Sequence, residues 1–169
     1  MIGLKIKFLS ENAKNVYDDG KLLNYQTMGS SGMDVRAVDV FLPATKETFV
    51  LGKDIENYEL RPNERVCVQL GIAAGGLSED YEIQIRPRSG LAFRSGITIV
   101  NAPGTIDSDY RGEIGALIHN LSHEPFTIKR GDRIAQMIVC PIAKCELEFV
   151  DELDETERGK GRFGSTGAR

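Results

Sequence analysis

The sequence predicts an all-β domain, and two observations support that prediction. The first is a series of short segments in which apolar and polar residues alternate, the pattern of a strand with one buried face. The second is that Gly, Pro, Asn and Asp stand between these segments at the spacing of a sandwich, a barrel or a jelly roll, with no long helical period between them. The 169 residues are 41% apolar and 27% charged, which is ordinary for one soluble globular domain.

Seven segments have this alternating pattern, and each is short enough to be a single strand. They are "MIGLKIKF" (1–8), "ERVCVQL" (64–70), "YEIQIRP" (81–87), "GITIV" (96–100), "EIGALIHN" (113–120), "PFTIK" (125–129) and "RIAQMIV" (133–139). The last of them is largely apolar on both faces, which favours a central position in a sheet. "RSGLAFRSG" (88–96) predicts instead one short helix, capped by Ser89 and ended by a left-handed Gly96. Residues 44–59 have weak patterning and predict a long loop with room for one short strand.

Charge and composition exclude several classes of protein. The net charge of −4 and the acidic run Glu146–Glu157 argue against a nucleic-acid polymer as the main partner, although a single nucleotide stays compatible. No segment approaches the ~18 consecutive apolar residues of a membrane span. The three cysteines are odd in number and lack C-x-x-C spacing, so we expect neither a disulfide framework nor a zinc site, and we expect a reducing cytoplasm.

A first candidate for an anion site lies where the strand at 81–87 ends. Pro87 delivers Arg88 and Ser89 into the turn before the predicted helix. An arginine, a hydroxyl and free backbone N–H groups at a helix start form a local phosphate site. The alternative is that the arginines form surface ion pairs and that Ser89 is only a helix cap.

A second candidate is "NAPGTIDSDYRGEIG" (101–115), predicted to be a hairpin with a polar tip that holds Asp107, Asp109 and Tyr110. A carboxylate is ionised at neutral pH and can take a proton from a bound water. Because Asp107 follows Ile106, we expect it in a fixed, partly sheltered position. The alternative is that both aspartates only form the turn.

Gln136 is the polar exception within the apolar strand at 133–139. A buried amide needs hydrogen-bonding partners, so Gln136 either ties two strands together or faces a polar ligand or water. The pattern alone favours the structural role.

Taken together, these pieces resemble the trimeric, all-β dUTPase (deoxyuridine 5'-triphosphate nucleotidohydrolase) family. Five ordered motifs carry the resemblance: "SSGMDVRA" (30–37), "RPRSGLA" (86–92), "NAPGTIDSDYRGE" (101–113), "GDRIAQM" (131–137) and "RGKGRFGSTG" (158–167). The resemblance implies a jelly-roll-like β-barrel over residues 1–153, a flexible C-terminal lid over 154–169, and a homotrimer whose active sites are shared between subunits.

The same resemblance implies the activity and the role of each site residue. The reaction would be hydrolysis of dUTP to dUMP and pyrophosphate, with Asp107 activating the water that attacks the α-phosphorus. Tyr110 would lie against the deoxyribose and exclude a 2′-hydroxyl. The residues that would contact uracil are Asn101, Gly104, Thr105, Ile106 and Gly115. Those that would contact phosphate are Arg88, Ser89, Gly90 and Gln136. Asp34 would support the phosphate and metal region without contacting the substrate directly. Mg²⁺ would be held by triphosphate oxygens and water rather than by protein ligands.

The glycine-rich tail contains one large apolar side chain, Phe163, that no strand or helix accounts for. By the resemblance, Phe163 would stack on uracil when the tail closes over the nucleotide. The tail residues that would contact the phosphates or pass close to them are Arg158, Gly164, Ser165 and Thr166. Arg162 departs from the family, which usually has glycine there, and we expect its side chain to point to solvent.

Two other functions stay open from the sequence. One is a dCTP deaminase, or a bifunctional deaminase and diphosphatase, on the same fold, which ammonia release from dCTP would identify. The other is a nucleotide-sensing or partner-binding module without catalysis. The presence of Asp107, Tyr110 and the "FGSTG" tail favours the diphosphatase over both.

Overall fold

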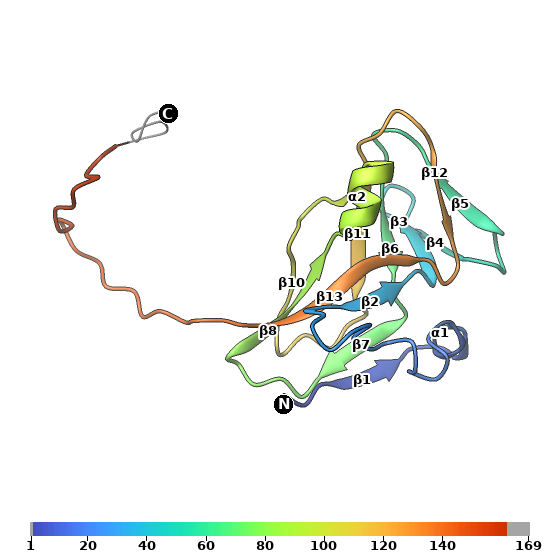
Figure 1. Ribbon diagram of the computed structural model, residues 1–169, viewed down its shortest axis with the longest axis horizontal. Coiled ribbons are helices and arrows are strands. Elements are labelled where there is room, and N and C mark those ends of the chain that lie inside the picture. The colour runs from blue at the N-terminus through green and yellow to red at the C-terminus, as the bar shows by residue number, and fades with distance from the viewer. Residues whose placement is uncertain (1, 162–169) are drawn as a thin grey trace.

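The structure, a computed structural model, describes residues 2–161, and most of its regular secondary structure is strand (Figure 1). The strands are β1 (Lys5–Phe8), β2 (Met33–Arg36), β3 (Asp39–Leu42), β4 (Glu47–Val50), β5 (Asn57–Leu60), β6 (Arg65–Gln69), β7 (Ile72–Gly75), β8 (Tyr81–Arg86), β9 (Ile97–Ile99), β10 (Gly104–Ile106), β11 (Gly115–Asn120), β12 (Phe126–Lys129) and β13 (Arg133–Pro141). The helices are α1 (Glu11–Val16) and α2 (Ser89–Ser95). The predicted all-β class is therefore confirmed.

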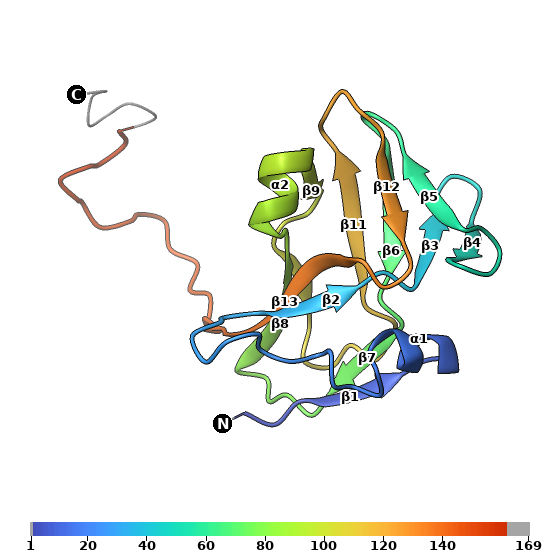
Figure 2. The same ribbon diagram turned by 45° about the vertical axis from the view of Figure 1, so that its right-hand side comes forward.

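Among the described residues the strands form four separate antiparallel sheets. A four-stranded sheet has the order β10-β8-β13-β2, and a five-stranded sheet has the order β4-β3-β6-β11-β9. Two smaller sheets pair β1 with β7 and β12 with β5. The sheets pack around one core, and Figures 1 and 2 show their arrangement from two directions. In residues 2–161 the paired strands do not close into a single barrel.

The alternation seen in the sequence decides which side chains enter that core. In β8, Ile83 and Ile85 are buried at 1% exposure each, and the alternate residues of the strand face outward. β13 lies between β8 and β2, which is the central position predicted from its two apolar faces. The outward face of β8 consequently carries the polar side chains Glu82, Gln84 and Arg86.

Three local predictions need correction. Helix α1 was not predicted, although the Ser10 hydroxyl caps it by accepting from the Ala13 N–H at 3.0 Å. Ser89 does not cap α2: Arg88 occupies the N-cap position, with no side-chain capping bond, whereas Gly96 ends the helix in the predicted left-handed conformation at φ 64°. The region 44–59 contains β4 and most of β5, because these strands find partners in β3 and β12.

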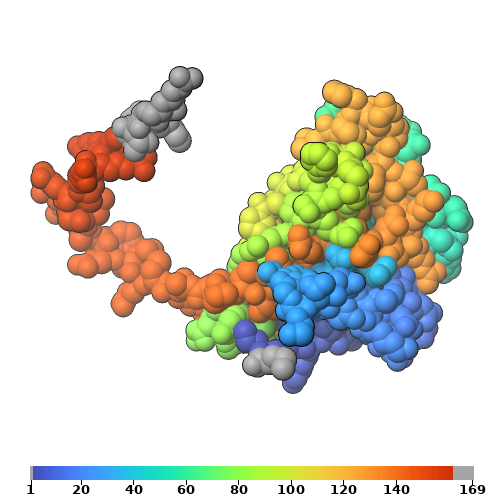
Figure 3. Space-filling view, viewed as in Figure 1, coloured from blue at the N-terminus to red at the C-terminus, as the bar shows by residue number. Residues whose placement is uncertain are grey.

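After β13 the chain leaves the body, and residues 142–161 extend away from it without forming a helix or a strand (Figure 3). Apolar side chains in this arm are exposed, with Phe149 at 92% and Leu147 at 73%. The predicted lid begins within the arm at residue 154 and continues beyond the described residues. Within residues 2–161, neither helix has the length and hydropathy needed to cross a bilayer.

Candidate functional site

Asp107 begins a loop, residues 107–114, between β10 and β11, and Asp107–Tyr110 form a turn at its start. β10 pairs with β8, whereas β11 pairs with β6 and β9, so the predicted hairpin is wrong: the loop joins two different sheets. A turn closes where the Tyr110 N–H donates to the Asp107 carbonyl at 3.1 Å. Arg111 Nη1 donates to the Ser108 and Tyr110 carbonyls at 2.8 Å each, which braces the loop from within.

Within the loop, the Tyr110 side chain is held by a hydrogen bond, whereas the Asp107 side chain is exposed. The Tyr110 hydroxyl donates to the Glu113 carbonyl at 3.0 Å, and its ring covers Gly112, where a Cβ would lie 2.3 Å from the hydroxyl oxygen. Asp107 itself is exposed in the single chain and not partly sheltered as the sequence predicts. The carboxylate of Asp107 is therefore free to meet water or a ligand from outside this chain.

The residues predicted to contact uracil fall into two places. Gly104, Thr105 and Ile106 form β10 and pair with Ile85, Gln84 and Ile83. Asn101 lies close to β10, since its Nδ2 would lie 3.4 Å from a Cβ at Gly104. Gly115 belongs to the five-stranded sheet, where it pairs with Gln69. Asn101 is thus packed beside β10, and Gly115 stands apart from it in the strand pairing.

Asp34 organises a cluster of arginines at the other end of the four-stranded sheet. Its carboxylate accepts from Arg88 Nε at 2.9 Å and from Arg133 Nη1 at 3.1 Å, and its side chain is only 13% exposed. Arg88 Nη1 also donates to the Arg133 carbonyl at 3.0 Å. One carboxylate therefore holds two cationic side chains from β13 and from the end of β8.

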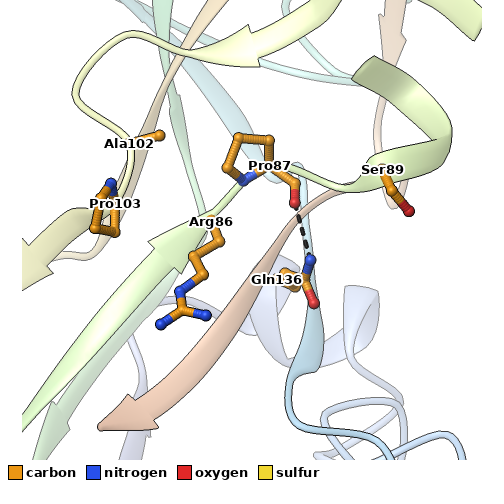
Figure 4. Close-up of a pocket in the computed structure, with 6 residues that line it drawn as sticks. All are labelled: Arg86, Pro87, Ser89, Ala102, Pro103 and Gln136. Atoms are coloured by element: carbon orange, nitrogen blue, oxygen red, sulfur yellow. Dashed lines mark hydrogen bonds between the residues drawn. The ribbon is translucent and has the colours of Figure 1, made fainter. Parts of the chain in front are cut away.

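A pocket of about 440 Å³ opens beside this cluster (Figure 4). Its lining residues are Arg86, Pro87, Ser89, Ala102, Pro103 and Gln136. Gln136 Nε2 donates to the Pro87 carbonyl at 2.9 Å, so the structural role expected from the pattern is present, while the residue also borders the pocket. Close approach of Gln136 requires Gly32, because a Cβ there would lie 2.9 Å from Gln136 Oε1. Gly90 follows Ser89 in α2 and lies under the Arg94 guanidinium.

The loop and the arginine cluster are far apart in one chain. Ile106 pairs with Ile83, so Asp107 is level with Glu82, whereas Gln136 pairs with Arg86. Four residues of strand separate these levels, which corresponds to about 13 Å at ~3.3 Å per residue, and Arg88 lies further on. Among the predicted site residues, the chain therefore brings together two groups and not one complete site.

Sequence reasoning missed the group that anchors the loop to the core. The Glu113 carboxylate accepts from the Gly71 N–H at 2.9 Å and from Gln69 Nε2 at 2.7 Å. Burial raises the pKa of Glu113 above its ordinary value, and these two hydrogen bonds work in the opposite direction. No sequence pattern predicts this contact, because its partners lie more than 40 residues away in the chain. Arg133 was missed for the same reason, since Asp34 is remote from it in sequence.

The predicted tail contacts lie mostly beyond the described part. Arg158 is exposed on the arm, while Arg162, Phe163, Gly164, Ser165 and Thr166 lie outside the described residues. Across residues 2–161, no group of three or more His, Cys, Asp or Glu side chains is arranged to hold a metal ion.

Comparison with known proteins identifies relatives across nearly the whole chain. A family profile described as dUTPase matches residues 53–167. The deoxyuridine 5'-triphosphate nucleotidohydrolase of Hydrogenobaculum sp. (strain Y04AAS1) is 45% identical over 156 residues, covering 92% of this chain and 96% of that protein. The protein of the same name from Nautilia profundicola is 44% identical over 164 residues, covering 97% and 98%.

Solved structures show the same fold at lower identity. The Staphylococcus bacteriophage 80alpha dUTPase with dUpNHpp has a TM-score of 0.73 at 23% identity, with 99% of both chains covered. A variant of the dUTPase from phage phi11 of S. aureus, whose structure describes the coordination of a structural Mg(II) ion, has a TM-score of 0.69 at 21% identity and covers 90% of this chain and 99% of that one.

Proposed function

The chain belongs to the dUTPase family, and on that premise we propose that it hydrolyses dUTP to dUMP and pyrophosphate. In a cell this reaction lowers dUTP and supplies dUMP for thymidylate synthesis. The observation that carries the proposal is the exposed Asp107 carboxylate on a loop braced by Tyr110 and Arg111. It stands in the same chain as a cluster of arginines suited to phosphate.

Asp107 acts as the general base. Its carboxylate accepts a proton from a water, and the hydroxide that develops attacks the α-phosphorus in line with the departing pyrophosphate. The hydrogen bond from the Tyr110 N–H to the Asp107 carbonyl and the two bonds of Arg111 hold the backbone that carries Asp107, so the position of this residue does not depend on the substrate. A fixed base reduces the entropy lost when the water is oriented.

The arginine cluster binds the triphosphate from the other side. Arg88 offers a planar guanidinium that suits phosphate oxygens, and Asp34 holds it in place before substrate arrives. Ser89 and Gln136 border the adjoining pocket and donate hydrogen bonds to phosphate or to ordered water there. Gly90 leaves room for the close approach of a phosphate.

The active site is shared between copies of the chain in a homotrimer. A general base acts within one hydrogen bond of its water, about 3 Å, so base and phosphate-binding groups must stand close together. The separation of Asp107 from Arg88 within one chain supports a site that takes Asp107 from one copy and the arginine cluster from another. The exposed position of Asp107 is compatible with a neighbour covering it.

Recognition of the nucleotide comes from β10, Tyr110 and the tail. The backbone of Gly104, Thr105 and Ile106 with Asn101, and Gly115, contact the uracil edge, and a cytosine would leave groups there unpaired. Tyr110 excludes the 2′-hydroxyl of ribonucleotides by shape. Phe163, with Arg158, Gly164, Ser165 and Thr166, closes over the bound nucleotide and excludes bulk water.

Mg²⁺ accompanies the triphosphate. An ion bound through phosphate oxygens and water needs few ligands from the protein, because Mg²⁺ readily keeps its water ligands. When bound, the ion neutralises charge on the phosphates. Within this chain, Arg88, held in place by Asp34, is the residue that adds positive charge on the phosphate side of the site.

Pyrophosphate release from dUTP, dTTP, dCTP and UTP tests the activity. We expect dUTP alone to be turned over well, with Asp107→Asn lowering kcat by about 10²- to 10⁴-fold while dUpNHpp still binds. Asp109→Asn is the matched control, since Asp109 is exposed on the same loop, and it should keep kcat within about twofold of wild type. Ammonia release from dCTP would identify the deaminase alternative. Equal turnover by the Asp107→Asn and Asp109→Asn proteins would overturn the assigned base.

Mixing two inactive variants tests the shared site. Asp107→Asn chains and Arg88→Ala chains are denatured together in equal amounts and refolded. In a cyclic trimer with random mixing, a site regains both groups when its Asp107 and its Arg88 each come from the intact donor, so about one quarter of the wild-type activity should return. A mixture that stays as inactive as its parts contradicts sharing between chains.

A further inference from the structure

Arg86 borders the pocket described above but has no role in the site so far. It lies opposite Gln136 in the pairing of β8 with β13, and both side chains leave the sheet on the same side (Figure 4). Pro87, Ala102 and Pro103 supply the apolar part of the same pocket. A cationic side chain thus stands at the edge of an apolar pocket, beside an amide.

Arg88 is paired with a carboxylate, whereas the positive charge of Arg86 is not neutralised in this way. Each guanidinium nitrogen of Arg88 already donates a hydrogen bond, to Asp34 or to the Arg133 carbonyl. Arg86 forms no ion pair with a carboxylate of residues 2–161, and its Nη1 donates to no acceptor within that range. Arg86 therefore keeps both a full positive charge and an unused donor for a ligand.

A neutral clamp holds Arg86 in this position. Gln84 Oε1 accepts from Arg86 Nε at 2.8 Å and also from its Nη2, while Gln84 Nε2 donates to Glu82. An amide oxygen fixes the direction of a guanidinium without neutralising it, which a carboxylate in the same place would do. Glu82, Gln84 and Arg86 share the outward face of β8 because they stand two residues apart in one strand.

We propose that Arg86 is a second cationic contact for the phosphate chain of the nucleotide, with Gln84 as its positioning residue. This inference rests on the proposed function and adds one binding residue to it. Arg86 would contact phosphate in the pocket that Ser89 and Gln136 line, and not in the cluster around Asp34. The pocket takes a phosphate oxygen between Arg86 Nη1 and the Gln136 amide. Arg88 and Arg86 then bind the phosphates from two sides, one arginine held by a carboxylate and the other by an amide.

Equilibrium binding of two probes tests the proposal: dUpNHpp and deoxyuridine. Arg86→Gln removes the charge and should weaken dUpNHpp by about tenfold, as expected for loss of one charge-assisted hydrogen bond. Deoxyuridine has no phosphate, so its affinity should change by less than about twofold. Arg61→Gln, an exposed arginine in the turn between β5 and β6, is the matched control and should leave both affinities unchanged.

Two further variants separate binding from structure. Arg86→Lys keeps the charge and should recover part of the lost affinity for dUpNHpp. Gln84→Ala keeps Arg86 but releases it, and should weaken dUpNHpp by less than Arg86→Gln does. In turnover, Arg86→Gln should raise KM for dUTP with kcat close to wild type, since a contact made equally in ground and transition states affects KM.

The outcomes distinguish this inference from the function on which it rests. If wild type turns over dUTP but Arg86→Gln binds dUpNHpp as tightly as wild type, the inference alone fails. Equal weakening of dUpNHpp and deoxyuridine, or a smaller particle by light scattering, would assign Arg86 to structure or to a contact with a carboxylate of another copy, and would also overturn it. A wild-type protein that binds dUpNHpp through Arg86 but does not hydrolyse dUTP would sink the proposed activity and leave the contact standing.

Discussion

Replacing Asn120 by alanine should destabilise the fold, because Asn120 is the one polar or charged residue among the described residues that is fully buried. Its Nδ2 donates to the Leu60 carbonyl at 3.0 Å and to the Glu124 carbonyl at 2.8 Å. Its Oδ1 accepts from the Ser122 N–H at 2.9 Å and from the Ser122 hydroxyl at 2.7 Å. All four hydrogen-bonding positions of the amide are filled, so β11, β5 and the following turn depend on it.

The magnitude follows from what the alanine leaves behind. The Leu60 carbonyl belongs to a fully buried residue and would lose its partner without access to water, at a cost of about 1.5 kcal/mol. The other three groups lie where water reaches them in part, so each loses about 0.5 kcal/mol. The free energy of unfolding should therefore fall by about 3 kcal/mol.

Urea unfolding followed by circular dichroism measures this difference at neutral pH. Asn57→Ala is the control, because Asn57 is exposed in β5 and should change the free energy of unfolding by less than about 0.5 kcal/mol. A loss below about 1 kcal/mol for Asn120→Ala would show that the four bonds are not jointly formed, and the reasoning from a saturated amide would be refuted.

Three more substitutions test other contacts. Burial raises the pKa of Tyr17 to about 12, so the folded chain retains a proton that the unfolded chain loses near pH 10, and the free energy of unfolding should fall as the pH rises between these values. Tyr17→Phe should reduce this slope in alkaline denaturation without abolishing it, because burial also raises the pKa of Tyr58. The substitution should cost about 1 kcal/mol for the lost hydrogen bonds to Arg36. Gly71→Ala should lower the free energy of unfolding by roughly 3 kcal/mol in urea, since Gly71 has φ 65° and a Cβ there would lie 2.4 Å from the Ala13 Cβ. Asp34→Asn should raise KM for dUTP with kcat near wild type, because Arg88 loses the carboxylate that holds it, and an unchanged KM would contradict that role.

The strands could be predicted from the sequence because alternation alone determines which side chains of a strand are buried. Ile83 and Ile85 in β8 follow that rule, and the central position of β13 follows from its two apolar faces. Alternation does not say which strand is the neighbour. For this reason the sequence predicts a hairpin around the loop after β10, although the two flanking strands belong to different sheets.

The site was predictable only as a set of residues. The resemblance to a family named Asp34 and Arg88, but their contact spans 54 positions of the sequence and needed a structure. The anchoring of the loop through Glu113 was not predictable at all, because neither Gly71 nor Gln69 belongs to a motif. The role of Arg86 was missed because a charged side chain in an alternating strand is ordinarily a solvated one.

The arm that follows β13 has a consequence for how the protein behaves in solution. From Glu146 to Phe149 it alternates acidic and apolar residues, and Leu147 and Phe149 are exposed to water. Mutual repulsion of the carboxylates keeps such segments from adhering to one another at low ionic strength, whereas added salt screens that repulsion over about 10 Å or less and leaves the apolar attraction unopposed. Added salt should therefore make these chains self-associate at a lower salt concentration than their overall acidic charge suggests.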